Sequence, residues 1–277
     1  MRSSRRSHDQ WERWGSVDPY FAVITEPDYH QARIDSAGRK QFFATGRHQV
    51  KKLLDAIEQC TGASPARTRA LDFGCGVGRL TLPLAERFEH VYGVDVSTSM
   101  LREAERNASE QHVSNVEWIE TPRLSELSGR YDLVLSTIVF QHIPVREGER
   151  LFATLVAGLR PGGCGAIAVT LGPGHPVARV LRWARKSVPF AHNFINVLVL
   201  RLNWSHPYME LNAYSLDRLG VLLADSGITQ WSVRFGRARK WRAMNIANII
   251  FRKPDADRAA DANSRVSSSG DRRDGAQ

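Results

Sequence analysis

The sequence predicts an α/β protein with a doubly wound, mostly parallel sheet that helices cover on both faces. Three observations predict it. Short apolar runs alternate with segments of helical periodicity between residues 69 and 170. A glycine-rich turn at 74–78 follows the first apolar run, and Asp95 ends the next one. Strands that alternate with crossover helices form parallel sheets, because such connections are right-handed and place helices on both faces.

The expected elements follow one another in this rhythm. A helix at 46–60 has apolar residues at helical spacing and precedes the strand at 69–73. A later helix at 215–227 begins with Ser215 as N-cap and ends with Gly227 as a C-cap signal. The other expected elements are helix 80–88, strand 91–94, helix 98–111, strands 116–119 and 133–136, helix 147–159, strand 165–170, and a closing antiparallel hairpin of strands 231–235 and 244–251.

Three segments interrupt or flank this domain, which we place at residues 46–252. Residues 1–45 begin as a basic tail and continue with aromatic residues among Asp and Pro, so we expect a solvated start followed by a short cap on the domain. Residues 171–212 break the rhythm after the fifth strand and are expected to form a helical insertion that covers the acceptor as a lid. Residues 253–277 lack apolar periodicity and are expected to be disordered.

The composition of the 277 residues, 42% hydrophobic and 24% charged, is that of a globular protein. The longest apolar stretch, at 194–202, is interrupted by Asn196 and Arg201, whereas a membrane-spanning helix needs about 20 apolar residues. No apolar run follows the basic start, so we expect no secretory signal and a cytoplasmic protein. A transmembrane segment is therefore not expected, although peripheral membrane contact stays open.

Cysteine spacing and net charge narrow the possible partners. Cys60, Cys75 and Cys164 are far apart, so neither a zinc site nor a disulfide is expected, and we predict that no metal is bound. The formal net charge of +9 favours anionic partners such as phosphates, nucleic acid or a lipid surface without choosing among them.

The glycine-rich turn is the most informative segment. Gly74, Gly76 and Gly78 lie between a strand that ends near Asp72 and a helix that follows, so main-chain N–H groups can face a ligand. A dinucleotide site has the spacing G-x-G-x-x-G, whereas the spacing here is G-x-G-x-G. Asp72 would repel a pyrophosphate, but it suits a ligand that carries an ammonium group.

A second acid supports this interpretation. Asp95 lies 17 residues after Gly78, at the carboxyl end of the strand expected beside the loop. A carboxylate in that place can accept both hydroxyls of a ribose. Taken alone, Asp95 could also be a helix cap or an exposed turn residue, but together with the glycine turn it indicates a nucleoside site.

The sequence resembles the class I S-adenosylmethionine (SAM)-dependent methyltransferases in four ordered motifs. These motifs are Leu-Asp-Phe-Gly-Cys-Gly-Val-Gly at 71–78, Gly-Val-Asp at 93–95, Tyr-Asp-Leu-Val-Leu-Ser at 131–136 and Leu-Arg-Pro-Gly-Gly at 159–163. The resemblance implies a seven-stranded sheet with a reversed final strand, and SAM as cofactor with its ribose on Asp95. The cofactor-binding residues that it implies are Asp72, Gly74, Cys75, Gly76, Gly78, Asp95, Val96, Met100 and Ser136.

One position departs from the pattern of that family. Many members carry an acid after the third strand that contacts adenine, but here Pro122 stands where that acid would fall. We expect adenine recognition from Glu120, or from the backbone at Arg123 and Leu124.

Methyl transfer from a sulfonium is a displacement whose rate depends largely on positioning and on the exclusion of water. If the acceptor is a hydroxyl, a base helps to remove its proton, and His142, just past the fourth strand, is the first candidate. The alternative is that Gln141 and His142 only shape the cofactor pocket. Further candidates within the insertion are His175, His206 and Glu210.

Three functions stay open at this point. The leading one is methyl transfer to a hydroxyl of a small polar metabolite, a sugar or a glycan, held between the aromatic N-terminal segment and the insertion at 171–212. An RNA methyltransferase is the alternative, because residues 234–253 contain seven basic and no acidic side chains. A SAM-binding protein without activity, or one that acts at a membrane surface through the basic pattern at 179–186, comes third.

Overall fold

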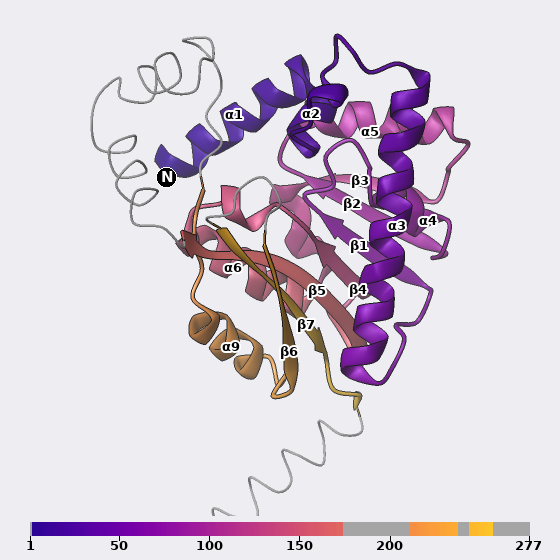
Figure 1. The fold of residues 1–277 in the computed structure, drawn as a ribbon. Coiled ribbons are helices and arrows are strands. Elements are labelled where there is room, and N and C mark those ends of the chain that lie inside the picture. The colour runs from indigo at the N-terminus through magenta and orange to yellow at the C-terminus, as the bar shows by residue number, and fades with distance from the viewer. Residues whose placement is uncertain (1, 174–210, 238–243, 257–277) are drawn as a thin grey trace, which may run out of the picture.

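The computed structural model describes residues 2–173, 211–237 and 244–256. Its strands are β1 (Arg69–Phe73), β2 (His90–Asp95), β3 (Val116–Glu120), β4 (Tyr131–Ser136), β5 (Leu159–Pro173), β6 (Trp231–Arg237) and β7 (Met244–Arg252). Within the described residues these seven strands form one sheet in the order β3-β2-β1-β4-β5-β7-β6 (Figure 1). Strands β1 to β5 pair in parallel, whereas β7 is antiparallel to both β5 and β6. The predicted doubly wound, mostly parallel sheet with an antiparallel hairpin is confirmed.

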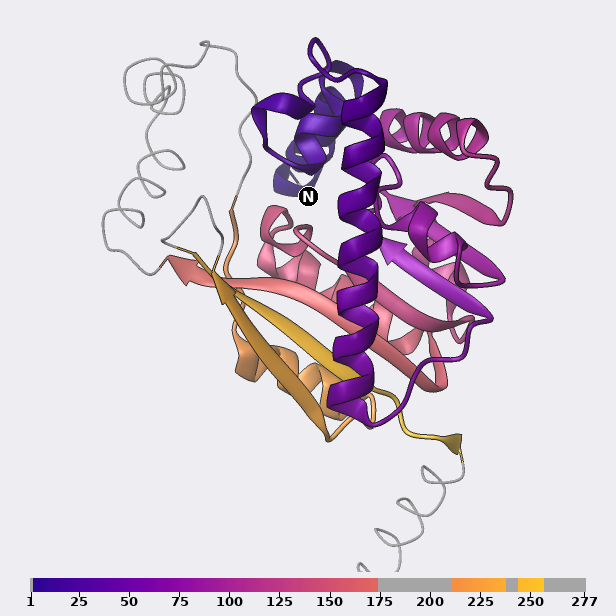
Figure 2. The ribbon, with the colours of Figure 1, turned by 45° about the vertical axis from the view of Figure 1, so that its right-hand side comes forward.

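Helices cover both faces of the sheet (Figures 1 and 2). One face packs on α3 and α4 through a core that includes Val50, Leu54 and Leu133, and the other packs on α6 and α9 through Val134 and Phe152. Neighbouring residues of β4 thus serve opposite faces, as the alternation of side chains along a strand requires. The bounds are α1 (Arg2–Val17), α2 (Pro19–Val23), η1 (Pro27–Tyr29), α3 (Ser36–Thr61), α4 (Thr81–Ala85), α5 (Thr98–Glu110), η2 (Thr121–Leu127), η3 (Phe140–His142), α6 (Val145–Ala157) and α9 (Leu216–Asp225).

The N-terminal segment is more helical than the sequence predicts. Residues 2–10, expected as a solvated tail, are the start of α1. Helix α3 begins ten residues earlier than predicted, at Ser36, where the Asp35 carboxylate accepts a hydrogen bond from the Gly38 N–H at 2.7 Å and so caps the helix. It ends at Gly62, which has a φ of 68°. The two later boundaries that the caps predict, at Ser215 and Gly227, agree with α9 to within two residues.

Several predictions fall on segments outside the described residues. The insertion at 171–212 is described only at its ends, so neither its helical content nor its role as a lid can be compared. The same holds for 257–277 of the predicted tail. The part of the tail that is described includes Lys253, whose backbone N–H donates to the Gly163 carbonyl at 2.8 Å. Among the described helices, none is long and apolar enough to cross a membrane.

The strand register brings the carboxyl ends of the inner strands together. Asp72 lies opposite Gly93 of β2 and opposite Leu135 of β4, and Asp95 lies opposite Glu120 of β3. The loops that follow these strands therefore meet at one edge of the sheet, where α1 and α2 also lie (Figure 1). Ligands of doubly wound sheets bind at this edge.

Candidate functional site

A cavity of about 1310 Å³ opens at the carboxyl edge of the sheet. Its walls come from the glycine turn after β1, the turns after β2, β3 and β4, the first turns of α6, and helices α1 and α2. Small-molecule sites commonly measure roughly 300–1,000 Å³, so this cavity has room for two ligands side by side.

The glycine turn forms one wall, and its shape requires glycine. Gly74 and Gly76 have φ values of 72° and 52°, a backbone region that side chains with a Cβ rarely adopt. A Cβ added to Gly74 would lie 2.2 Å from the side chain of Val139, and one added to Gly76 would lie 2.6 Å from that of Val23. The turn is tied to β2, since the N–H of Gly74 donates to the Val94 carbonyl at 2.7 Å. Both glycines line the cavity.

Asp95 joins the glycine turn to the start of α5. Its carboxylate accepts a hydrogen bond from the Gly76 N–H at 2.8 Å and another from the Ser97 N–H at 3.0 Å. Burial raises the pKa of Asp95, although these N–H donors oppose the shift. A carboxylate has about four acceptor sites, and the backbone donors do not occupy all of them; Asp95 also lines the cavity, so it can still accept a hydroxyl group of a ligand.

Val96 and Met100, two further residues predicted to bind the cofactor, also line the cavity. The other four lie behind its wall, since Asp72, Cys75, Gly78 and Ser136 are not among the described residues that line it. The Ser136 hydroxyl donates to the Phe73 carbonyl at 3.0 Å, which holds β4 to β1. Burial raises the pKa of the Cys75 thiol well above its usual value, so this thiol stays protonated.

Asp72 is a buried acid directly behind the glycine turn. Its side chain is 2% exposed and accepts a hydrogen bond from the Thr81 hydroxyl at 2.7 Å. Burial raises its pKa to about 6, against the effect of the Thr81 hydrogen bond and of the nearby Arg79 cation. Asp72 is therefore a buried acid close to the loop, and it anchors the start of α4 through Thr81.

The turn after β3 forms the wall where adenine recognition was expected. Thr121, Pro122, Leu124 and Ser125 line the cavity, so this wall has apolar and hydroxyl side chains and no acid at position 122. Of the three residues expected to contact adenine, Leu124 lines the cavity, whereas Glu120 and Arg123 are not among the described residues that line it. The Glu120 carboxylate accepts a hydrogen bond from the Thr98 hydroxyl at 3.1 Å.

His142 lines the cavity but is 6% exposed and held by its neighbours. The Thr170 hydroxyl donates to the Gln141 side-chain oxygen at 3.2 Å, which turns the Gln141 amide nitrogen toward His142 Nε2 at 3.1 Å. In this arrangement Nε2 accepts from the amide, so its lone pair is already occupied. This geometry favours the interpretation that His142 shapes the pocket. The other base candidates, His175, His206 and Glu210, lie outside the described residues.

Helices α1 and α2 complete the cavity from the N-terminal side. Ser7, His8 and Trp11 of α1 line it, and the Trp11 ring meets the His142 ring edge-on with centroids 4.9 Å apart. Ser7 and His8 were not predicted as site residues, because they fall in the segment expected as a solvated tail.

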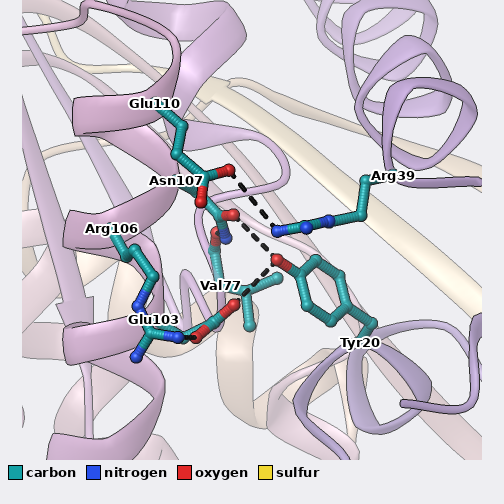
Figure 3. A network of polar contacts seen from close by, with 7 residues as sticks. All are labelled: Tyr20, Arg39, Val77, Glu103, Arg106, Asn107 and Glu110. Atoms are coloured by element: carbon teal, nitrogen blue, oxygen red, sulfur yellow. Dashed lines mark hydrogen bonds and ion pairs between the residues drawn. The ribbon is translucent and has the colours of Figure 1, made fainter. Parts of the chain in front are cut away.

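A buried polar network fixes α2 to the domain (Figure 3). The hydroxyl of Tyr20, which is 1% exposed, lies 2.9 Å from a Glu103 carboxylate oxygen and 2.7 Å from the Asn107 side-chain oxygen. Asn107 in turn donates to the carbonyl of Val77, within the glycine turn, at 3.1 Å. The N-terminal segment thus contacts the residues that support the glycine turn.

In the described residues, no group of three His, Cys, Asp or Glu side chains is arranged to hold a metal ion.

Comparison with known proteins agrees with this geometry. A family described as a methyltransferase domain matches residues 70–163, which run from β1 into β5 and include the glycine turn and Asp95. This segment of the chain therefore belongs to a methyltransferase domain family. SAM is the cofactor of the methyltransferases that this segment resembles, and the cavity fits it on two observations: Gly74 and Gly76 line it with backbone that carries no side chain, and Asp95 lines it with acceptor sites left for ribose hydroxyls.

Two curated relatives and one solved structure illustrate what this chain is similar to. Trans-aconitate 2-methyltransferase of Deinococcus radiodurans is 37% identical over 115 residues, which cover 41% of this chain and 42% of that protein. Magnesium-protoporphyrin O-methyltransferase of Synechocystis is 38% identical over 87 residues, covering 31% and 38%. The crystal structure of magnesium protoporphyrin IX methyltransferase from Synechocystis PCC 6803 with bound S-adenosylhomocysteine (SAH) covers 88% of this chain and 94% of its own, with a TM-score of 0.53 and 20% identity. The match thus spans less than half the length of these curated relatives, and the solved structure supports the fold.

Proposed function

We propose that this protein transfers a methyl group from SAM to a hydroxyl of a small polar metabolite, a sugar or a glycan. The observation that carries the proposal is the Asp95 carboxylate, which joins the glycine turn to the start of α5 while it faces a cavity larger than one ligand needs. The remaining room lies toward α1 and α6, where polar and aromatic side chains meet.

When bound, SAM would supply a methyl group on a positively charged sulfur: the acceptor oxygen would bond to the methyl carbon, the carbon–sulfur bond would break to leave SAH, and the hydroxyl proton would pass to solvent. The protein has to position the two molecules and exclude water, since the donor is already activated. Asp95 holds the nucleoside part, and the glycine turn lets the methionine part approach the backbone at Gly74 and Gly76, whose N–H groups are themselves bonded to Val94 and Asp95. Asp72 adds a buried negative charge that favours a cationic ligand, and α1 covers the cavity with Trp11.

The polar part of the lining supports a polar acceptor. Ser7 and His8 face the cavity from α1, and Arg146 and Arg150 face it from α6. The relatives are named for small acceptors, among them trans-aconitate, magnesium protoporphyrin and a step of ubiquinone biosynthesis. These names support a small molecule over a macromolecule. We assign to His142 a role in shaping the pocket, because the Gln141 side-chain amide donates a hydrogen bond to its Nε2.

The RNA alternative receives less support from the described part of the basic run at 234–253. Arg234 donates to the Gln59 side chain at 2.8 Å, and Arg252 pairs with Asp255 at 2.9 Å. Lys253 donates through Nζ to the Leu159 carbonyl at 2.8 Å. These three cations are thus engaged within the protein. The basic pattern at 179–186, on which a membrane-surface role would depend, lies outside the described residues.

The formation of SAH in the presence of candidate acceptors tests this proposal. The full chain is incubated with SAM and with hydroxylated sugars and metabolites, carboxylic acids, or RNA in separate reactions. We expect SAH to form with a member of the hydroxyl group and the product to be an ether. Turnover confined to RNA, and lost when Arg234 and Arg237 are neutralised, would replace the proposal with the RNA alternative. Turnover confined to carboxylic acids would move the methylated atom to a carboxylate oxygen.

A further inference from the structure

An acidic residue of α1 contacts the turn that carries Asp95. The Glu12 carboxylate accepts hydrogen bonds from the Ser97 hydroxyl at 2.7 Å, from the Ser99 hydroxyl at 2.5 Å and from the Ser99 N–H at 3.1 Å. Ser99 lies in the first turn of α5, where backbone N–H groups have no partner within the helix and a negative charge is stabilising. These donors lower the pKa of Glu12, so it stays ionised.

Ser97 links Glu12 to the ribose carboxylate. Its backbone N–H donates to Asp95 at 3.0 Å, while its hydroxyl donates to Glu12 and accepts from the Met100 N–H at 3.1 Å. Ser97 is fully buried, so the three bonds leave it little freedom to turn. A displacement of Glu12 would therefore reach Asp95 through one residue.

Close packing holds α1 against the same turn. A Cβ added to Gly15 would lie 2.6 Å from the Ser97 hydroxyl oxygen and 3.1 Å from the Met100 side chain, so only glycine permits this approach. Toward its other end, α1 reaches the opposite side of the cavity, where the Ser7 hydroxyl donates to the His142 carbonyl at 3.2 Å. Helix α1 thus spans the cavity from the turn after β2 to the turn after β4.

We infer that Glu12 is a positioning residue for the cofactor, which fixes the turn that carries Asp95 and fastens α1 across the occupied cavity. Glu12 lies outside residues 70–163, the segment that matches the methyltransferase domain family. The inference rests on the proposed function for the identity of the ligand. According to this inference, α1 has two effects on the ligand. It raises the equilibrium affinity by positioning Asp95, and it slows ligand release by covering the cavity.

The test is stopped-flow release of SAH from the full-length protein, with melting temperatures measured without ligand. Glu12→Ala removes all three contacts, so we expect release to be faster by about tenfold or more, which corresponds to about 1.4 kcal/mol. Gly15→Ala introduces the Cβ that displaces α1 without changing a charge, and it should accelerate release as well. Glu12→Gln keeps one acceptor oxygen, which can still accept from the Ser97 hydroxyl and the Ser99 N–H, and it places an amide donor beside the Ser99 hydroxyl, so release should return part of the way to the wild-type rate.

The matched control is Glu105→Ala, which removes an exposed acid of α5 away from the cavity and should leave the release rate unchanged. Release that stays at the wild-type rate in both Glu12→Ala and Gly15→Ala, with only a lower melting temperature, would overturn the inference and leave the proposed function intact. Wild-type protein that binds neither SAM nor SAH would instead overturn the proposed function, and this inference with it.

Discussion

The Asp95 carboxylate accepts a hydrogen bond from the backbone N–H of Gly76 at 2.8 Å. One acid thereby holds the turn after β1 and, through Ser97, the turn after β2. The two turns that we propose hold the nucleoside are thus fixed to each other by contacts within the protein. Pre-organisation of this kind raises affinity, because less ordering remains to be done on binding.

Replacement of Asp95 tests this relationship. Asp95→Ala should weaken SAH binding by about 1–3 kcal/mol, because a charge-assisted contact is lost and the glycine turn loses its anchor. Asp95→Asn keeps one acceptor oxygen and should lose less. Isothermal titration calorimetry gives the values, with Asp55→Ala on the exposed side of α3 as the control. An unchanged affinity in Asp95→Ala would move the ribose site elsewhere.

The close approach of the Val139 side chain to Gly74 can be tested with a single and a double variant. Gly74→Ala should lower both stability and SAH affinity, since a left-handed backbone costs a residue with a Cβ about 1–2 kcal/mol and the Cβ meets Val139. Adding Val139→Ala removes the two nearest atoms and should recover part of the stability. Urea unfolding of the single and double variants measures this. A double variant no more stable than Gly74→Ala would contradict the assigned contact.

The pH dependence of stability tests the burial of Asp72. Its folded-state pKa of about 6 lies above the ordinary value of 3.8, so the folded protein holds this proton more tightly than the unfolded chain does. The Asp72 contribution to stability is therefore most favourable below pH 4 and is lost as the pH rises to about 6. Asp72→Asn keeps the acceptor for Thr81 and lacks this dependence.

Comparison of wild type and Asp72→Asn by urea unfolding at pH 4 and pH 7.5 gives the result directly. The stability of the variant relative to wild type should improve at the higher pH, by up to roughly 3 kcal/mol. A difference between the two proteins that does not change with pH would show that Asp72 titrates as an exposed acid does.

The Gln141 amide on His142 Nε2 predicts the kinetics of a third variant. His142→Ala should lower kcat by less than about tenfold and leave the pH profile of kcat unchanged, since the ring shapes the pocket. Steady-state kinetics over pH 5–9 with the identified acceptor makes the measurement. A loss of about 100-fold or more, with the acidic limb of the profile removed, would identify His142 as the base.

Local patterns in the sequence predict the part of the site that local geometry determines. The glycine turn, Asp95 and the strands around them are set by residues close in the chain, so the predicted strand 91–94 and the observed β2 (His90–Asp95) differ by one residue at each end. Gly74 and Gly76 of the G-x-G-x-G motif line the cavity. The motif could be recognised in the sequence because their positive φ values favour glycine over other residues.

The contribution of α1 could not be predicted in the same way. Glu12 meets Ser97 and Ser99 across more than eighty residues of sequence, and Ser7 meets His142 across 135. Nothing in the local pattern around Ser7 and His8 reports such contacts, because a polar segment without regular apolar spacing is typical of a tail. Similarly, Asp72 and Ser136 belong to matched motifs, but only the packed structure places them behind the wall.

Calorimetric titration of the full chain with SAH, and with NAD as the competing nucleotide, tests the central claim that the glycine turn and Asp95 form a SAM site. We expect SAH to bind with a Kd in the micromolar range, about −8 kcal/mol, and NAD to give no measurable heat. Tight binding of NAD together with no binding of SAM or SAH would contradict the claim.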